Sequence, residues 1–122
     1  ITIRGVANGK GAGTNPTVNL VGGNDDITIA GNIINTNGVN HGVLVNKGSN
    51  VTIGGATLAE RNTIANAGDE AIRILDSNGV TVASNLITNA ADNSVLAFRS
   101  QNVTVDNNTI LNTGSTNGAA IN

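Results

Sequence analysis

Two pairs of adjacent carboxylates are the residues of this 122-residue sequence whose types best suit chemistry. They are Asp25-Asp26 and Asp69-Glu70, and each pair borders a predicted turn. Glycoside hydrolysis needs two carboxyl groups that face each other across a sugar. Adjacent residues of a strand point to opposite faces, and we place the two pairs at different corners of the fold. We therefore predict no catalytic pair and interpret these carboxylates as solvated turn residues.

Arg73 follows Asp69 and Glu70 closely, and the three residues form the best local cluster on the chain. A bound cation would need more ligands than two carboxylates supply. The favoured interpretation is an ion pair at the surface, with Arg73 pointing outward. We keep Asp69, Glu70 and Arg73 as a candidate ligand or ion cluster, and predict no cofactor.

His41 is the single histidine, and the chain has no cysteine. Disulfides, thiolate metal sites and cysteine nucleophiles are thereby excluded. His41 lies just before a predicted strand, next to Gly42, and no serine or cysteine nucleophile pattern accompanies it. We expect a histidine in a turn or on the surface, and no catalytic triad.

The elements that position these residues come from an internal repeat. A triplet of two apolar residues around a threonine occurs five times, at intervals of 26, 24, 29 and 23 residues. The alternation predicts a strand with two inward apolar side chains and one outward threonine. The copies are Ile1-Thr2-Ile3, Ile27-Thr28-Ile29, Val51-Thr52-Ile53, Val80-Thr81-Val82 and Val103-Thr104-Val105.

A second element, Asn-x-Ile, follows in four copies, beginning at Asn32, Asn62, Asn85 and Asn108. In the third copy this asparagine comes six residues late, which predicts a loop insertion at about Gly55 to Glu60. The first copy lacks the element and has a glycine-rich stretch from Asn8 to Thr14 instead, so its second strand is uncertain.

A third short apolar element closes each copy, and turn dipeptides punctuate the chain. The third elements are Val18 to Val21, Val43 to Val45, Ala71 to Leu75, Val95 to Phe98 and Ala119 to Ile121. The predicted turns are Asn8-Gly9, Asn37-Gly38, Asn78-Gly79 and Asn117-Gly118.

Three short strands per copy bury little alone, but stacking about 4.8 Å apart pairs each strand with its equivalents. We predict an all-β fold: a right-handed, single-stranded parallel β-helix of about five coils, with three short strands per coil. The coils span about 1–26, 27–50, 51–79, 80–102 and 103–122. A single aromatic residue, Phe98, indicates a narrow interior of Ile, Val, Leu and Ala. An antiparallel sandwich is the competing fold, but it does not predict a recurring triplet.

Stacked coils should align equivalent outward residues into ladders. We expect a threonine ladder, which we attribute to the ordinary preference of threonine for strands rather than to ice binding. We also expect an asparagine ladder whose side-chain amides form hydrogen bonds between coils. Outward apolar residues near the second strand offer a lateral contact. These sets are Thr2, Thr28, Thr52, Thr81 and Thr104; Asn35, Asn66, Asn89 and Asn112; and Ile33, Leu86 and Leu111.

The repeat [Ile/Val]-Thr-[Ile/Val]-x-x-Asn-x-Ile-x-x-Asn resembles that of the pectate-lyase-like superfamily, in its bacterial secreted and surface type. Val80 to Asn89 and Val103 to Asn112 are most similar to it in spacing. The resemblance implies polysaccharide lyases or hydrolases, and Ca²⁺ held by carboxylates with an arginine or lysine as base. On this chain Asp69, Glu70 and Arg73 would be the matching residues. One aromatic residue makes no sugar platform, which weighs against a carbohydrate-active cleft.

The net charge is −2, with six Lys and Arg in total. Such a chain has no electrostatic footprint for nucleic acid, and no apolar run is long enough to span a bilayer. We therefore expect no nucleic-acid partner, no membrane insertion and no enzyme activity. The leading hypothesis is an extracellular structural module of a bacterial or archaeal surface: a filament subunit, adhesin stalk or spacer.

Its expected partners are copies of itself or flanking coils stacked head to tail, because bare solenoid ends are aggregation-prone edges. The chain would then be one β-helix domain within a larger or polymerised protein. The alternative is a catalytic or non-catalytic fragment of a polysaccharide lyase or hydrolase that binds acidic glycans.

Overall fold

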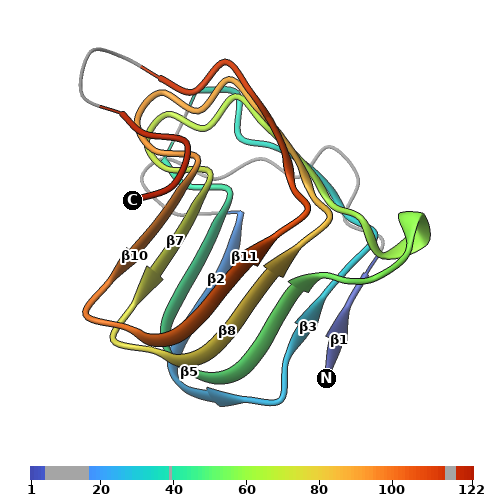
Figure 1. Cartoon of the computed structure of the whole chain (residues 1–122), viewed down its shortest axis with the longest axis vertical. Coiled ribbons are helices and arrows are strands. Elements are labelled where there is room, and N and C mark those ends of the chain that lie inside the picture. Colours follow the sequence, from blue (N-terminus) through green and yellow to red (C-terminus); the bar gives the residue numbers. More distant parts are fainter. Residues whose placement is uncertain (5–16, 39, 115–117) are drawn as a thin grey trace.

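The computed structural model describes residues 1–4, 17–38, 40–114 and 118–122, and it is an all-β structure (Figure 1). The elements are β1 (Thr2–Ile3), β2 (Val18–Asp25), β3 (Thr28–Ile29), β4 (Ile33–Asn35), β5 (Val43–Gly54), the short 3-10 helix η1 (Leu58–Glu60), β6 (Thr63–Ala65), β7 (Ile72–Leu75), β8 (Asn78–Ala83), β9 (Leu86–Thr88), β10 (Val95–Phe98), β11 (Gln101–Asp106) and β12 (Thr109–Leu111).

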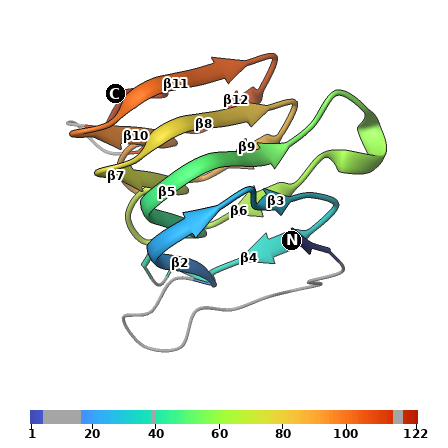
Figure 2. The same cartoon turned by 90° about the horizontal axis from the view of Figure 1, so that it is seen from below.

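Each strand pairs in parallel with the equivalent strands of neighbouring repeats, which lie side by side in Figure 2. Within the described residues, β4, β6, β9 and β12 form one sheet, and the other strands belong to a second sheet. The predicted triplets align in register, with Thr28 opposite Thr52 and Thr52 opposite Thr81. The repeat deduced from sequence therefore corresponds to one unit of strand pairing.

The strands that close one repeat and open the next share a sheet, and β7 and β8, like β10 and β11, are the separate short strands that we predict. In β5 they are instead one continuous element from Val43 to Gly54, so the prediction of two strands is wrong there. The bend between the closing and the opening strand begins at a residue of positive φ: Lys47 at 60°, Asp76 at 48° and Arg99 at 48°. A left-handed residue turns the backbone sharply without a long loop, so pairing with the neighbouring repeat resumes two residues later, at Ser49 and Asn78.

Asn78-Gly79, predicted as a turn, lies inside β8. Gly79 has φ of 72°, and the register aligns it with Asn50 at 53° and Asn102 at 52°. The dipeptide therefore supplies a left-handed position, as an Asn-Gly pair favours, but within a paired strand. Asn37-Gly38 does form a turn.

The interior is a stack of β-branched side chains. Equivalent inward residues of successive repeats, such as Ile34, Ile64 and Ile87, are fully buried. Phe98 stands outside the core and is 51% exposed. A narrow interior with one layer of aliphatic side chains per repeat accounts for the near absence of aromatic residues.

The predicted insertion at Gly55 to Glu60 is a loop that contains η1 and projects from the stack between β5 and β6 (Figure 2). Glu60 closes it: Oε2 accepts from the Ala56 N–H at 2.9 Å, and Oε1 accepts from Thr57 Oγ1 at 3.0 Å. The flanking strands keep their register across the loop, so the insertion leaves the repeat intact.

Near the two ends of the chain, one predicted strand is confirmed only in part, and several predicted features lie outside the described residues. Of the predicted last strand, Ala119 to Ile121, only Ile121 forms a bridge, to Val95. The glycine-rich stretch Asn8 to Thr14 with its Asn8-Gly9 turn, and Asn117 of the last predicted turn, lie outside the described residues.

Candidate functional site

The candidate cluster forms at the start of β7. Asp69 and Glu70 belong to the connection between β6 and β7, and Arg73 is the second residue of β7. Arg73 Nη1 lies 3.4 Å from Glu70 Oε2 and 4.0 Å from Asp69 Oδ2. The expected arginine–carboxylate pair is therefore present, with the Arg73 side chain half-buried.

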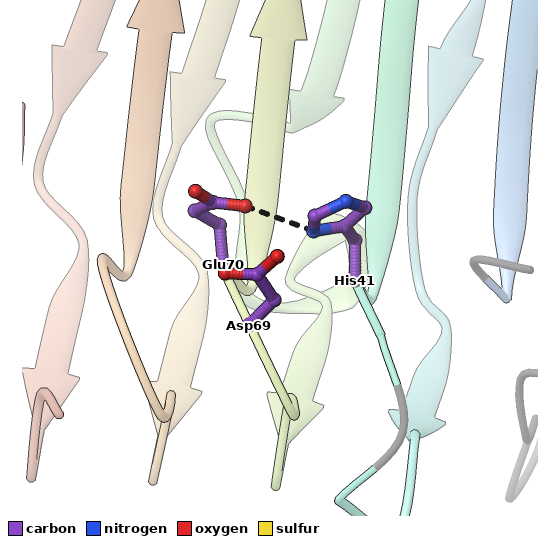
Figure 3. Close-up of side chains that lie close together, drawn as sticks. All are labelled: His41, Asp69 and Glu70. Atoms are coloured by element: carbon purple, nitrogen blue, oxygen red, sulfur yellow. Dashed lines mark ion pairs between the residues drawn. The ribbon is translucent and has the colours of Figure 1, made fainter. Parts of the chain in front are cut away.

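His41 joins this cluster, and we had not predicted it there. Val43 pairs with Ile72, and the residues two positions earlier, His41 and Glu70, consequently become neighbours (Figure 3). His41 is 8% exposed and Glu70 is 4% exposed. We predict that His41 lies in a turn or on the surface and that Glu70 is solvated. Both side chains are buried, so the predicted exposure is wrong.

The two buried side chains meet closely but without an aligned hydrogen bond. His41 Nδ1 lies 2.9 Å from Glu70 Oε2, yet among the described residues Nδ1 has no partner in hydrogen-bonding geometry. One ligand atom each from His41, Asp69 and Glu70 lies within 4.8 Å of the others. Three potential metal ligands from two successive repeats therefore converge.

The local backbone explains this placement. Asn40 Oδ1 accepts from the His41 N–H at 2.8 Å, and the Gly68 N–H donates to Asn40 O at 2.9 Å. A Cβ on Gly42 would lie 2.5 Å from Ile64 Cγ2 and 2.8 Å from Ala71 O. Only glycine permits the close approach that brings the segment before β5 against the segment before β7.

The carboxylates of Asp25-Asp26 lie elsewhere, at the corner between β2 and β3, and both residues are exposed. Asp26 Oδ1 accepts a hydrogen bond from Asn50 Nδ2. This pair has the solvated environment that we predicted for it.

A buried column of asparagines is the main polar feature missed from sequence. Each Asn-x-Ile motif supplies one member, and from Asn62 onward each Oδ1 accepts from the main-chain N–H and Nδ2 of the preceding member. Asn62 Oδ1 accepts from Asn32 in this way, both at 3.0 Å. Asn85 Oδ1 accepts likewise from Asn62, and Asn108 Oδ1 from Asn85. The signal was the fixed spacing of the motif.

A second column is the asparagine ladder expected from sequence. Asn66 Nδ2 donates to Asn35 Oδ1, Asn89 Nδ2 to Asn66 Oδ1 and Asn112 Nδ2 to Asn89 Oδ1, each at 3.1 Å. The ladder runs along the outer surface, where Asn89 and Asn112 are exposed. Both columns tie one repeat to the next.

The remaining predicted sets occupy outer faces. Strand pairing aligns the five threonines Thr2, Thr28, Thr52, Thr81 and Thr104 in one row. Ile33 and Leu111 are 51% and 52% exposed, whereas Leu86 is half-buried. Ile33 and Leu86 are the strand-pairing partners of Thr63 on its two sides, so they lie in one row across the sheet. Leu111 pairs with Thr88 and belongs to a different row of the same sheet.

A groove of about 570 Å³ lies between the insertion loop and the threonine row. Thr52 and Thr81 line it together with two carboxylates, Glu60 and Asp106. We had not paired these carboxylates, since they lie two repeats apart in sequence. Glu60 is engaged within its own loop.

Comparison with known proteins yields no relative: no family model, no curated protein and no solved structure matches the chain. In the described part of the chain, no helix is long and apolar enough to cross a membrane.

Proposed function

We propose that the chain is a section of a right-handed parallel β-helix of the pectate-lyase-like type, and that it serves as a structural module outside the cell. In this proposal it acts as a surface filament subunit, adhesin stalk or spacer of a bacterium or archaeon. The proposal assigns it no reaction.

The observation that carries the proposal is where the polar side chains go. Asn32, Asn62 and Asn85 are buried and bond from repeat to repeat, ending on the half-buried Asn108. The outer ladder bonds between repeats in the same way at the surface. Fully bonded polar columns rigidify a structure along their direction. These contacts support a stiff rod, because the repeats from Asn32 onward are joined to one another by the same hydrogen bonds.

The last described repeat supports end-to-end stacking. Its inward residues Val103, Val105 and Ile110 are partly exposed, whereas the equivalent residues one repeat earlier, Val80, Val82 and Ile87, are completely buried. A further repeat on this face would bury them. We infer that flanking repeats or a second copy of the chain stack there, head to tail, and that successive additions propagate in one direction.

Negative-stain images of the native protein test this function. We expect rods or filaments whose long axis follows the direction in which the repeats stack. Isolated compact particles with closed ends, under the conditions of the source, would argue against a structural module.

The groove favours a second candidate, the binding of a polysaccharide. Thr52 and Thr81 offer hydroxyl groups beside the carboxylates of Glu60 and Asp106. Acidic and neutral glycans should be screened for both binding and turnover, with Asp106→Asn as the groove variant and Asp25→Asn as the control. Binding that only the groove variant loses would support this candidate, and a panel without binding or turnover would remove it.

A further inference from the structure

We propose that His41, Asp69 and Glu70 bind a divalent transition-metal ion of the Zn²⁺ type, which links two successive repeats. The inference is independent of whether the protein forms rods. It assigns to the cluster a ligand class different from the Ca²⁺ that the family resemblance implies.

The orientation of the His41 ring is the first support. Nδ1 is buried, 2.9 Å from Glu70 Oε2, and without a hydrogen-bond partner in the described residues. A neutral ring protonated on Nε2 leaves the Nδ1 lone pair facing a carboxylate oxygen, and a proton on Nδ1, in the other neutral tautomer or in the charged ring, would be misaligned with that oxygen. An unpartnered buried polar atom is costly. A cation shared by the nitrogen and the oxygen would give Nδ1 the partner that it lacks.

The distances fit such an ion. Zn²⁺ binds nitrogen and oxygen ligands at about 2.0–2.2 Å, which separates neighbouring ligand atoms by about 2.9 to 3.5 Å. The Nδ1–Oε2 distance of 2.9 Å already meets the lower value. Asp69 is half-buried, with 45% of its side chain exposed, and its carboxylate lies within 4.8 Å of the other ligand atoms. A side-chain rotation would therefore complete three protein ligands.

The ligand types select the class of metal. Ca²⁺ takes six to eight oxygen ligands, and this cluster offers two carboxylates and one imidazole. Imidazole with carboxylate suits Zn²⁺ and its neighbours in the first transition row. His41 is the single histidine, and the sequence has no cysteine. No other imidazole or thiolate can bind Zn²⁺, so binding of the ion elsewhere on the chain should be weak.

The positive charge of Arg73 should weaken binding of a metal ion at this cluster. Its guanidinium lies 3.4 Å from Glu70 Oε2 and 4.0 Å from Asp69 Oδ2, where it neutralises the charge that a cation would use. A bound divalent ion must displace this side chain, which is one-third exposed and can turn toward solvent. Loss of the arginine charge should consequently strengthen metal binding.

The test uses the untagged protein titrated with Zn²⁺, and Ca²⁺ in parallel, followed by calorimetry and by ¹⁵N NMR of the single histidine. We expect one Zn²⁺ per chain, a shift of the Nδ1 resonance and a higher melting temperature. Ca²⁺ should produce none of these changes. Asp69→Asn and His41→Gln should weaken binding by at least about tenfold, Arg73→Gln should strengthen it, and Asp106→Asn should leave it unchanged.

Arg73→Gln keeps the test decisive if His41→Gln fails to fold, because misfolding does not produce tighter binding. An unshifted Nδ1 resonance in the presence of Zn²⁺ would overturn the proposal. So would Zn²⁺ binding that Asp69→Asn leaves intact, or equal binding of Ca²⁺.

Discussion

Asp76 and Arg99 stand one repeat apart at the same corner, beside the paired residues Leu75 and Phe98. Arg99 donates through Nε to Asp76 Oδ1 at 2.7 Å and through Nη2 to Oδ2 at 2.8 Å. Its guanidinium also lies 4.9 Å above the Phe98 ring. Hydrogen bonding to Arg99 lowers the pKa of Asp76, and the same bonds raise the pKa of Arg99.

We predict that Arg99→Gln returns the pKa of Asp76 toward its ordinary value of about 3.9. Because folding lowers this pKa, the ion pair contributes stability above that value and the contribution fades as the pH falls through the folded-state pKa. The pair is exposed, so its contribution to stability is small. A ¹³C titration of the Asp76 carboxyl group measures the shift, with Arg4→Gln as the control. An unchanged Asp76 titration in Arg99→Gln would contradict the assigned cause.

The residues of the charged cluster show what sequence reveals at this scale. Asp69, Glu70 and Arg73 are close in the chain, so their proximity was predictable from spacing. His41 lies 29 positions before Glu70, and it becomes a neighbour only through the pairing of Val43 with Ile72. The exposure of a histidine or glutamate depends on that register, which single residues do not reveal.

At the scale of elements, the buried asparagine column should contribute more to the free energy of unfolding than the outer ladder does. Asn62→Ala removes the Oδ1 that accepts two hydrogen bonds from Asn32. It also removes the Nδ2 group that donates to Ile29 O and to Asn85 Oδ1. We expect a loss of about 2–4 kcal/mol in the free energy of unfolding, since buried polar partners lose their bonds.

Asn35→Ala is the matched substitution in the outer ladder, and it should cost less than about 1 kcal/mol because water replaces the lost bonds. Denaturant unfolding of both variants gives the comparison. Equal losses would show that the buried column has no special part in stability.

The insertion loop gives a second prediction for elements. Removal of 55–60, combined with Arg61→Gly, restores the spacing of the regular repeats. The glycine is needed because the equivalent Gly31 and Ser84 have φ of 68° and 58°, whereas Arg61 has −59°. We expect an unchanged circular dichroism spectrum and a free energy of unfolding within about 1 kcal/mol of the parent, since loop length costs little entropy.

Removal of 80–85 from a regular repeat is the control of equal length, and it should abolish cooperative unfolding. If the loop deletion unfolds the protein as well, the insertion is part of the fold rather than an addition to it.

The elements were largely predictable because one pattern recurs. The triplets locate the strands that open each repeat, and the late Asn62 locates the insertion. The merging of two predicted strands into β5 was not predictable in the same way. Lys47 has a positive φ inside β5, for which lysine has no intrinsic preference, but Asp76 and Arg99 also have a positive φ between strands that stay separate.

At the scale of the whole molecule, the described strands pair in parallel with their equivalents in neighbouring repeats, and inward side chains are covered by the repeats on either side. Middle repeats have a neighbour on each side, so Ile64 and Ile87 are fully buried. Stability in such arrays is approximately a sum over repeats and their interfaces. The apolar face of the last described repeat is therefore the part of the molecule on which the proposed end-to-end stacking depends.

Sedimentation velocity of the protein and of Val105→Lys, over a wide range of concentration, tests end-to-end stacking most directly. Val105 points into the exposed face of the last described repeat, where an inward charge blocks edge pairing. Thr104→Lys puts the same charge on the outer side of the same strand as the control. We predict that the parent and Thr104→Lys form larger species as concentration rises, whereas Val105→Lys stays a single unit. A parent that stays a compact monomer throughout, or a Val105→Lys variant that assembles equally well, would contradict the proposal.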